Sequence, residues 1–139
     1  IAWLALDEPA IAAEYFADTT KKNVLGPFHT WSEMPNGGGC PNFVTGAGAY
    51  LQIFWAGYAG MRLRDNSLSF REPRLPGKAT AVLLRSLFYR GNVLDVHITR
   101  SNITIALSGE SPAGAPLLHA RHTKSSSGEG HAQIHPIAR

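Results

Sequence analysis

The amino-acid sequence predicts an α+β fold in which helices come first and antiparallel strands follow. Apolar residues recur at helical spacing in the first 62 residues, whereas apolar and polar residues alternate with a period of two between residues 67 and 108. Of the 139 residues, 44% are hydrophobic. This length and composition predict one folded domain with a core, or two small adjoining units, and argue against disorder of the whole chain.

The first predicted helix covers residues 9–22. Asp7 is a suitable N-cap residue, and Pro9 suits the first turn, where its missing N–H breaks no helical hydrogen bond. Lys21 and Lys22 lie where cations stabilise the negative end of the helix dipole. We expect the helix to stop at Gly26–Pro27 and a loop to follow as far as residue 42. The apolar side of this predicted helix consists of Ile11, Ala12, Tyr15 and Phe16.

The second predicted helix covers residues 43–60. No charged residue occurs between Met34 and Met61, so the segment 43–61 is long enough to be considered as a membrane span. Its glycines, together with Thr45 and Gln52, favour instead a helix that is buried on nearly all faces inside a large soluble protein. The residues expected on one helical face are Val44, Ala47, Leu51, Phe54 and Tyr58.

Four antiparallel strands are predicted in the second part of the chain. Alternation of apolar and polar residues indicates that three of them have one buried face, whereas residues 79–90 are expected to be buried more thoroughly. Turns are expected at Gly91–Asn92 and Arg100–Ser101. The predicted strands are residues 67–71, 80–89, 92–99 and 102–108. The expected organisation is a helical part (1–62), a β domain (63–121) and a flexible Ser- and Gly-rich tail (122–139).

The net charge and the numbers and positions of cysteine and histidine argue against several classes of protein. The net charge is only +3, and Lys and Arg are scattered along the sequence, so no nucleic-acid partner is expected. The single cysteine, Cys40, excludes an internal disulfide and a multi-cysteine zinc site. Four histidines near the C-terminus are expected to be solvated, and neither a metal nor an organic cofactor is predicted. These histidines are His119, His122, His131 and His135.

The location in the cell stays open at this stage. A lone cysteine slightly favours the cytoplasm, whereas the sequon at Asn102 would suit a secreted or lysosomal protein. The chain lacks an initial Met and starts within an apolar run, which predicts a piece of a longer protein. No membrane partner is expected.

One loop between the predicted helices, residues 28–39, contains the candidate functional residues. It combines His29, Trp31 and Glu33 with a run of three glycines. An indole face stacks on a sugar ring, and a carboxylate binds hydroxyls or activates water, so the loop suits a sugar site. The alternative is a solvated Glu33 beside a Trp31 that packs into the core. The following Thr45–Gly48 segment lacks the lysine of a phosphate-binding loop and is expected to be a tightly packed helix start.

Three segments together resemble a known family. Trp31-Ser32-Glu33, the run Asn42-Phe43-Val44-Thr45-Gly46-Ala47-Gly48-Ala49-Tyr50-Leu51-Gln52 and the later stretch from Leu87 to Leu94 resemble the C-terminal part of glycoside hydrolase family 65, within its acid-trehalase-like branch. The resemblance extends over about residues 1–108. It implies that residues 1–62 are the last helices of an (α/α)6 toroid and that a small antiparallel β-sandwich or β-sheet domain follows.

The resemblance also implies a function. Family hydrolases invert the anomeric centre with a general acid and a general base, and the matching Trp-x-Glu motif makes Glu33 the base. Trp31 and His29 would contact the sugar, and Thr45 and Gln52 would support the site. Glu33 favours hydrolysis over phosphorolysis, which does not need this base. Met34 and Ala49 depart from the family pattern.

The general acid implied by the family would lie upstream of this chain, so the segment alone is expected to be inactive. The implied substrate is an α-glucoside, either a glucosyl-galactosyl-hydroxylysine unit such as those on collagen or trehalose. The alternative function is a non-catalytic carbohydrate-binding or interaction module formed by the β part.

Overall fold

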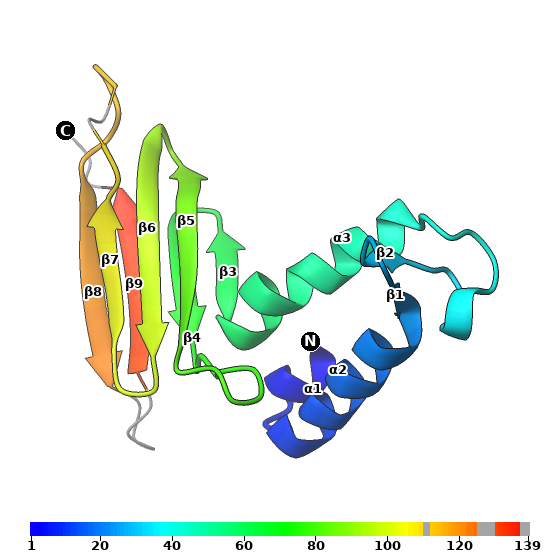
Figure 1. Cartoon of the computed structure of the whole chain (residues 1–139). Coiled ribbons are helices and arrows are strands. Elements are labelled where there is room, and N and C mark those ends of the chain that lie inside the picture. Colours follow the sequence, from blue (N-terminus) through cyan, green and yellow to red (C-terminus); the bar gives the residue numbers. More distant parts are fainter. Residues whose placement is uncertain (110–111, 125–129, 137–139) are drawn as a thin grey trace. The chain divides into compact units, whose positions relative to one another are not determined.

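The computed structural model describes residues 1–109, 112–124 and 130–136 (Figure 1). The chain divides into two compact units, Ile1–Gly57 and Tyr58–Arg139. The first unit contains the helices, and the strands of both β-sheets larger than two strands lie in the second. The predicted order of helices before strands is therefore confirmed.

The first unit contains two main helices and the loop between them. The helix α2 confirms the first predicted helix, with Pro9 in its first turn. Its N-cap residue is Glu8 and not Asp7, whose backbone φ of 60° takes it out of the capping position. At the other end, Lys22 pairs with Asp18 at 2.8 Å. The elements are α1 (Ala2–Ala5), α2 (Pro9–Asn23), β1 (Val24–Leu25), β2 (Thr30–Trp31), η1 (Pro35–Gly37), α3 (Val44–Gln52) and η2 (Ile53–Tyr58).

The second predicted helix is shorter than expected, and its hydrogen-bonding type changes along its length. It is α-helical as α3 and then widens into the π-helical turns of η2. Within this chain Val44 is 80% exposed and Leu51 is 62% exposed, so burial on nearly all faces is not observed. Tyr50 and Phe54 pack instead against Phe16 of α2, with ring centroids 5.4 and 5.6 Å from that of Phe16. In the described part of the chain no helix has the length and apolarity needed to span a membrane.

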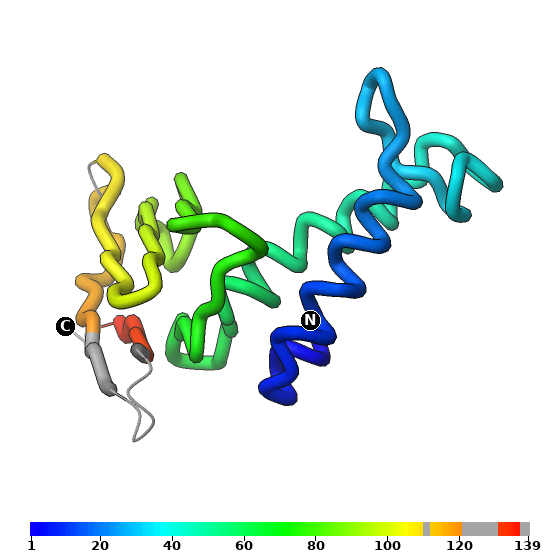
Figure 2. The backbone as a smooth tube through the Cα atoms, turned by 60° about the horizontal axis from the view of Figure 1, so that its bottom comes forward, coloured from blue at the N-terminus to red at the C-terminus, as the bar shows by residue number. Residues whose placement is uncertain are grey.

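The second unit is a two-layered antiparallel β-sandwich (Figures 1 and 2). One sheet has the strand order β3-β4-β9-β8 and the other has the order β5-β6-β7. The core between them contains Phe70 and Ile134 from the first sheet and Val96 and Ile98 from the second, each at most 2% exposed. The strands are β3 (Met61–Arg64), β4 (Ser67–Arg71), β5 (Ala81–Tyr89), β6 (Asn92–Thr99), β7 (Ile103–Leu107), β8 (Leu118–Lys124) and β9 (Gly130–Pro136).

Two expectations about the β part are wrong. The strand predicted at residues 80–89 is not thoroughly buried, because β5 is an edge strand whose outer side leaves Leu83 46% and Phe88 75% exposed. The predicted flexible tail contains β9, which pairs with β4 and β8 inside its sheet. Its two apolar residues, Ala132 and Ile134, are 4% and 2% exposed, and this burial explains why a polar segment is ordered. Residues 125–129 and 137–139 lie outside the described residues.

Candidate active-site loop

The loop that contains Glu33 is fixed to the end of α2 by Ser32. The Ser32 side chain is fully buried, and its backbone N–H donates to the Asn23 carbonyl at 2.8 Å. The Asn23 side chain donates back to the Ser32 carbonyl at 3.1 Å. The Ser32 hydroxyl lies 2.7 Å from the carbonyl oxygen of Met34. This anchor was not identified from the sequence, because a serine between Trp and Glu carries no signal of burial.

Glu33 itself is exposed and is tethered at two points to Cys40. Its backbone N–H donates to the Cys40 carbonyl at 2.9 Å, and its Oε2 accepts a hydrogen bond from the Cys40 backbone N–H at 3.1 Å. The glycines between them make this possible. Gly39 has a φ of +70°, and a Cβ added there would lie 2.7 Å from Glu33 Oε2. The carboxylate is therefore presented on a surface loop in a defined orientation.

Trp31 belongs to an aromatic cluster of the first unit. Its ring centroid lies 4.9 Å from that of Tyr50, which stacks on Phe16 with an interplanar angle of 3°. Gly46 allows the indole to approach the first turn of α3, because a Cβ there would lie 2.5 Å from Trp31 Nε1. The indole is half-buried against these neighbours, and the nearby Glu33 is exposed. The roles of Trp31 and Glu33 stay predictions.

The three other candidate residues lie on exposed surface of the first unit. His29 follows the β1 strand in a left-handed conformation with φ 53°. Thr45 lies in the first turn of α3, and Gln52 is its last residue. Thr45 and Gln52 are seven positions apart, which places them on one stripe of the helix about 10 Å apart along its axis. Among the described residues no hydrogen bond joins His29, Thr45 or Gln52 to Glu33. The role of each of these residues stays a prediction.

Neither the cysteine nor the histidines form a metal centre in the part of the chain that the structure describes. No group of three His, Cys, Asp or Glu side chains gathers there in a way that could hold an ion. Cys40 is exposed and free. Asn102 is exposed in the turn after β6, and its side chain donates to Thr104 Oγ1 at 3.3 Å.

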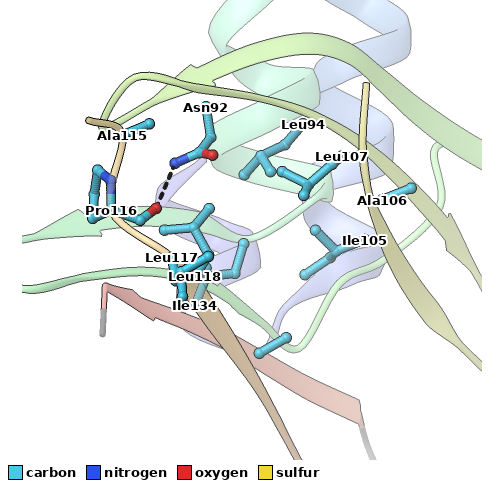
Figure 3. A pocket seen from close by; sticks show the side chains of 11 residues that line it. Asn92, Leu94, Ile105, Ala106, Leu107, Ala115, Pro116, Leu117, Leu118 and Ile134 are labelled. Atoms are coloured by element: carbon cyan, nitrogen blue, oxygen red, sulfur yellow. Dashed lines mark hydrogen bonds between the residues drawn. The ribbon is translucent and has the colours of Figure 1, made fainter. Parts of the chain in front are cut away.

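The second unit contains a pocket of about 200 Å³ between its two sheets (Figure 3). Leucine, isoleucine, alanine and proline side chains line it, and Asn92 is the one polar residue of the lining. The Asn92 side chain donates to the Pro116 carbonyl at 3.1 Å. The described residues of the lining include no acid or base.

Comparisons with known proteins add a family and several relatives. Residues 61–122 match the model described as "Glycosyl hydrolase family 65, C-terminal domain". A relative from Danio rerio, named protein-glucosylgalactosylhydroxylysine glucosidase, is 36% identical over 107 residues, which are 77% of this chain and 16% of the relative. Proteins of the same name from Mus musculus and Dictyostelium discoideum are 29% and 33% identical over 86% and 81% of this chain. The chain spans about a sixth of the length of these relatives. No solved structure matches the chain.

Proposed function

The resemblance to glycosyl hydrolase family 65 is confirmed, since residues 61–122 carry its C-terminal domain, and from this premise we propose that the chain is part of a longer inverting α-glucosidase. In this proposal Glu33 is the general base. A water molecule attacks the anomeric carbon, gives its proton to Glu33, and displaces the leaving oxygen, which takes a proton from the general acid. The acid belongs to residues upstream of this chain.

The observation that carries the proposal is the tethered carboxylate of Glu33. Oε2 accepts the Cys40 N–H, whereas Oε1 takes no hydrogen bond within the described residues. One oxygen is thus oriented by the backbone while the other is open to a water molecule. A general base must lie within hydrogen-bond reach of the proton that it takes, and a fixed orientation satisfies the geometric part of that requirement.

Exposed apolar side chains support the assignment of the first unit to a larger helical toroid. Leu6 and Leu51 are 68% and 62% exposed, and Trp3 and Trp55 are 40% and 38% exposed. A monomeric domain rarely leaves so many large apolar residues in water. Further helices of an (α/α)6 toroid would cover them, and α2 and α3 would be its last helices.

The names of the relatives support a glucosyl-galactosyl-hydroxylysine unit as the substrate, with trehalose as the second choice. His29 and the accessible edge of Trp31 would contact the sugar. Thr45 and Gln52 would donate or accept hydrogen bonds from the exposed stripe of α3. Gly48 lies between them on that stripe, and a Cβ there would meet nothing within 4 Å, which leaves the stripe open to a ligand.

The stereochemistry of the product tests the mechanism. The full-length protein should release glucose from one of these α-glucosides, and proton NMR of the first turnover products should detect the β-anomer before mutarotation. Release of the α-anomer would contradict an inverting mechanism. Absence of turnover on both substrates would contradict the substrate assignment. The 139-residue segment alone should show no turnover, because it carries only one of the two carboxylates.

A carbohydrate-binding module is the second candidate function. The observation that favours it is Phe88, which is 75% exposed on the outer side of β5 and pairs across the strands with Val93. An exposed aromatic ring is suited to stack on a sugar. Residues 63–121 would be a poor fragment for a glycan pull-down, because they lack β9. Residues 58–136 contain both sheets, and neutral-glycan binding that is lost in Phe88→Ala would support this candidate.

A further inference from the structure

Ser32 occupies the middle position of the Trp-x-Glu segment, where the family resemblance specifies no residue type. Its side chain is fully buried, although Glu33 and Met34, which follow it, are exposed. Burying a hydroxyl is unfavourable unless the hydroxyl forms hydrogen bonds. Two carbonyl oxygens lie within reach of Ser32 Oγ, that of Met34 at 2.7 Å and that of Asn23 at 3.2 Å. The serine is therefore buried by polar contacts and not by apolar packing.

The shorter of these two contacts joins the two residues that flank Glu33 in the chain. A hydroxyl has a single proton to donate, so the 2.7 Å contact makes the Met34 carbonyl its acceptor. This bond limits the backbone conformations that Glu33 can adopt, because it closes across that residue. On the far side, the Met34 N–H donates to the Gly38 carbonyl at 3.0 Å. The direction in which the Glu33 side chain leaves the backbone is thus set by its neighbours.

Asn23, the last residue of α2, holds Ser32 from the opposite side. Its carbonyl accepts the Ser32 N–H at 2.8 Å, and its side chain donates to the Ser32 carbonyl at 3.1 Å. Both backbone polar groups of Ser32 are therefore bonded to one residue of a 15-residue helix. The Ser32 hydroxyl extends this attachment by two residues, to Met34. A short chain of hydrogen bonds thus connects the backbone of Glu33 to α2.

We infer that Ser32 is a positioning residue for the Glu33 carboxylate and that Asn23 acts with it. The inference rests on the proposed function, in which Glu33 is the general base. The Cys40 N–H fixes the end of the Glu33 side chain at Oε2, whereas Ser32 fixes its start on the backbone. A base must lie within hydrogen-bond reach of its proton, and a displacement of about 1 Å costs about 100-fold in rate. The middle position of the motif therefore requires a small residue that carries a hydroxyl.

A double-mutant cycle in the full-length enzyme tests the inference, with steady-state kinetics on the glucoside as the measurement. Ser32→Ala should lower kcat about ten-fold or more and change KM by less than about two-fold, because the base acts in the transition state. In a Glu33→Gln background, Ser32→Ala should change kcat by less than about two-fold, because no base is left to be positioned. A merely structural serine would lower kcat by the same factor in both backgrounds, and that result would overturn the inference.

Ser69→Ala is the matched control for the loss of a buried hydroxyl. Ser69 is 3% exposed, and its hydroxyl donates to the Arg62 carbonyl at 3.5 Å in the β unit. This variant should keep kcat within about two-fold of the parent, because independent distant sites do not couple. An equal loss of kcat in Ser32→Ala and Ser69→Ala would overturn the inference.

Asn23→Ala gives the same test if Ser32→Ala does not fold. It removes the side-chain bond to the Ser32 carbonyl and leaves the Ser32 hydroxyl in place. It should lower kcat in the parent enzyme and leave kcat unchanged in the Glu33→Gln background. Full activity of the Ser32 and Asn23 variants, with kcat lost in Glu33→Gln, would overturn the inference and leave the proposed function standing. Full activity of Glu33→Gln would overturn the proposed function itself.

Discussion

The backbone N–H of Cys40 donates a hydrogen bond of 3.1 Å to Oε2 of Glu33, across the turn that Gly37, Gly38 and Gly39 form. The Glu33 N–H donates in return to the Cys40 carbonyl at 2.9 Å. These two bonds join the start and the end of the glycine turn. The orientation of the proposed catalytic carboxylate therefore depends on the backbone of Cys40 and on three glycines, which have no side-chain functional group.

Replacing Gly39 by alanine should displace Glu33. The added Cβ would lie 2.7 Å from Oε2 and 3.0 Å from the Glu33 Cβ, so the carboxylate must move. A displacement of about 1 Å can cost about 100-fold in rate, and we expect kcat of the full-length enzyme to fall 10- to 100-fold with little change in KM. The measurement is steady-state kinetics on the glucoside.

Gly77→Ala is the matched control for this variant. Gly77 has a φ of +53°, which imposes a similar backbone strain of about 1–2 kcal/mol. Nothing lies within 4 Å of its added Cβ, so no side chain has to move. The control should keep kcat. If both variants lose activity equally, the effect comes from backbone strain and not from the position of Glu33.

Replacing Glu33 by glutamine should remove base catalysis without disturbing the loop. The amide is nearly isosteric, and its oxygen can still accept the Cys40 N–H. General base catalysis contributes about 10²- to 10⁴-fold, and the loss should appear in kcat because the base acts in the transition state. The acidic limb of the pH–rate profile, which reports protonation of the base, should disappear. A variant that keeps its activity within a few-fold, with that limb intact, would show that Glu33 is not the base.

Two glycines in the same helix should respond oppositely to alanine. Both substitutions in α3 gain helix propensity, but an added Cβ at Gly46 would meet Trp31 Nε1 at 2.5 Å and Phe43 Cδ1 at 2.7 Å, whereas Gly48 faces open space. Overpacking typically costs about 1–3 kcal/mol. We therefore expect Gly46→Ala to unfold more easily than Gly48→Ala by about that amount in chemical denaturation. Equal stabilities would mean that Trp31 does not pack against the start of α3.

Strand β9 should be essential to the β unit although its sequence is polar. Ile134 is 2% exposed in the core, so Ile134→Ala should cost about 2–5 kcal/mol of unfolding free energy. Leu63→Ala is the control, because Leu63 is 71% exposed on the edge strand β3. Truncation after residue 121 should unfold the unit, as measured by the loss of its thermal transition. If the truncated protein still folds, residues 122–139 are not required for the stability of the unit.

Local sequence patterns were sufficient to predict the elements whose buried residues repeat with a regular helical or strand period. The helix predicted at 9–22 is α2, and the alternating segments at 67–71, 92–99 and 102–108 are strands. The pattern failed for β9, because only Ala132 and Ile134 supply its buried side. It also overestimated the burial of β5, because no period distinguishes a central strand from an edge strand.

For the candidate site, residue types pointed to the loop but not to its geometry. The Trp31–Glu33 pair and the glycine run drew attention to the loop, yet the tether to Cys40 and the buried Ser32 depend on distances that no spacing encodes. The contacts of the Trp31 ring could not be predicted from the sequence either. Whether an indole meets a sugar or a neighbouring ring depends on Tyr50, nineteen residues later, and the structure puts the two rings 4.9 Å apart.

The sequence by itself determined the order of helices and strands, the family resemblance and the candidate carboxylate, because these follow from local periodicity and from short motifs. Tertiary structure alone decided which strands pair and what they bring together. Leu68 meets Ile134 across 66 residues of sequence, and that pairing aligns Arg71 with His131 on the opposite face of the sheet. Residues that lie far apart in the sequence therefore become neighbours in one sheet, because strand pairing is a non-local contact that a linear pattern cannot record.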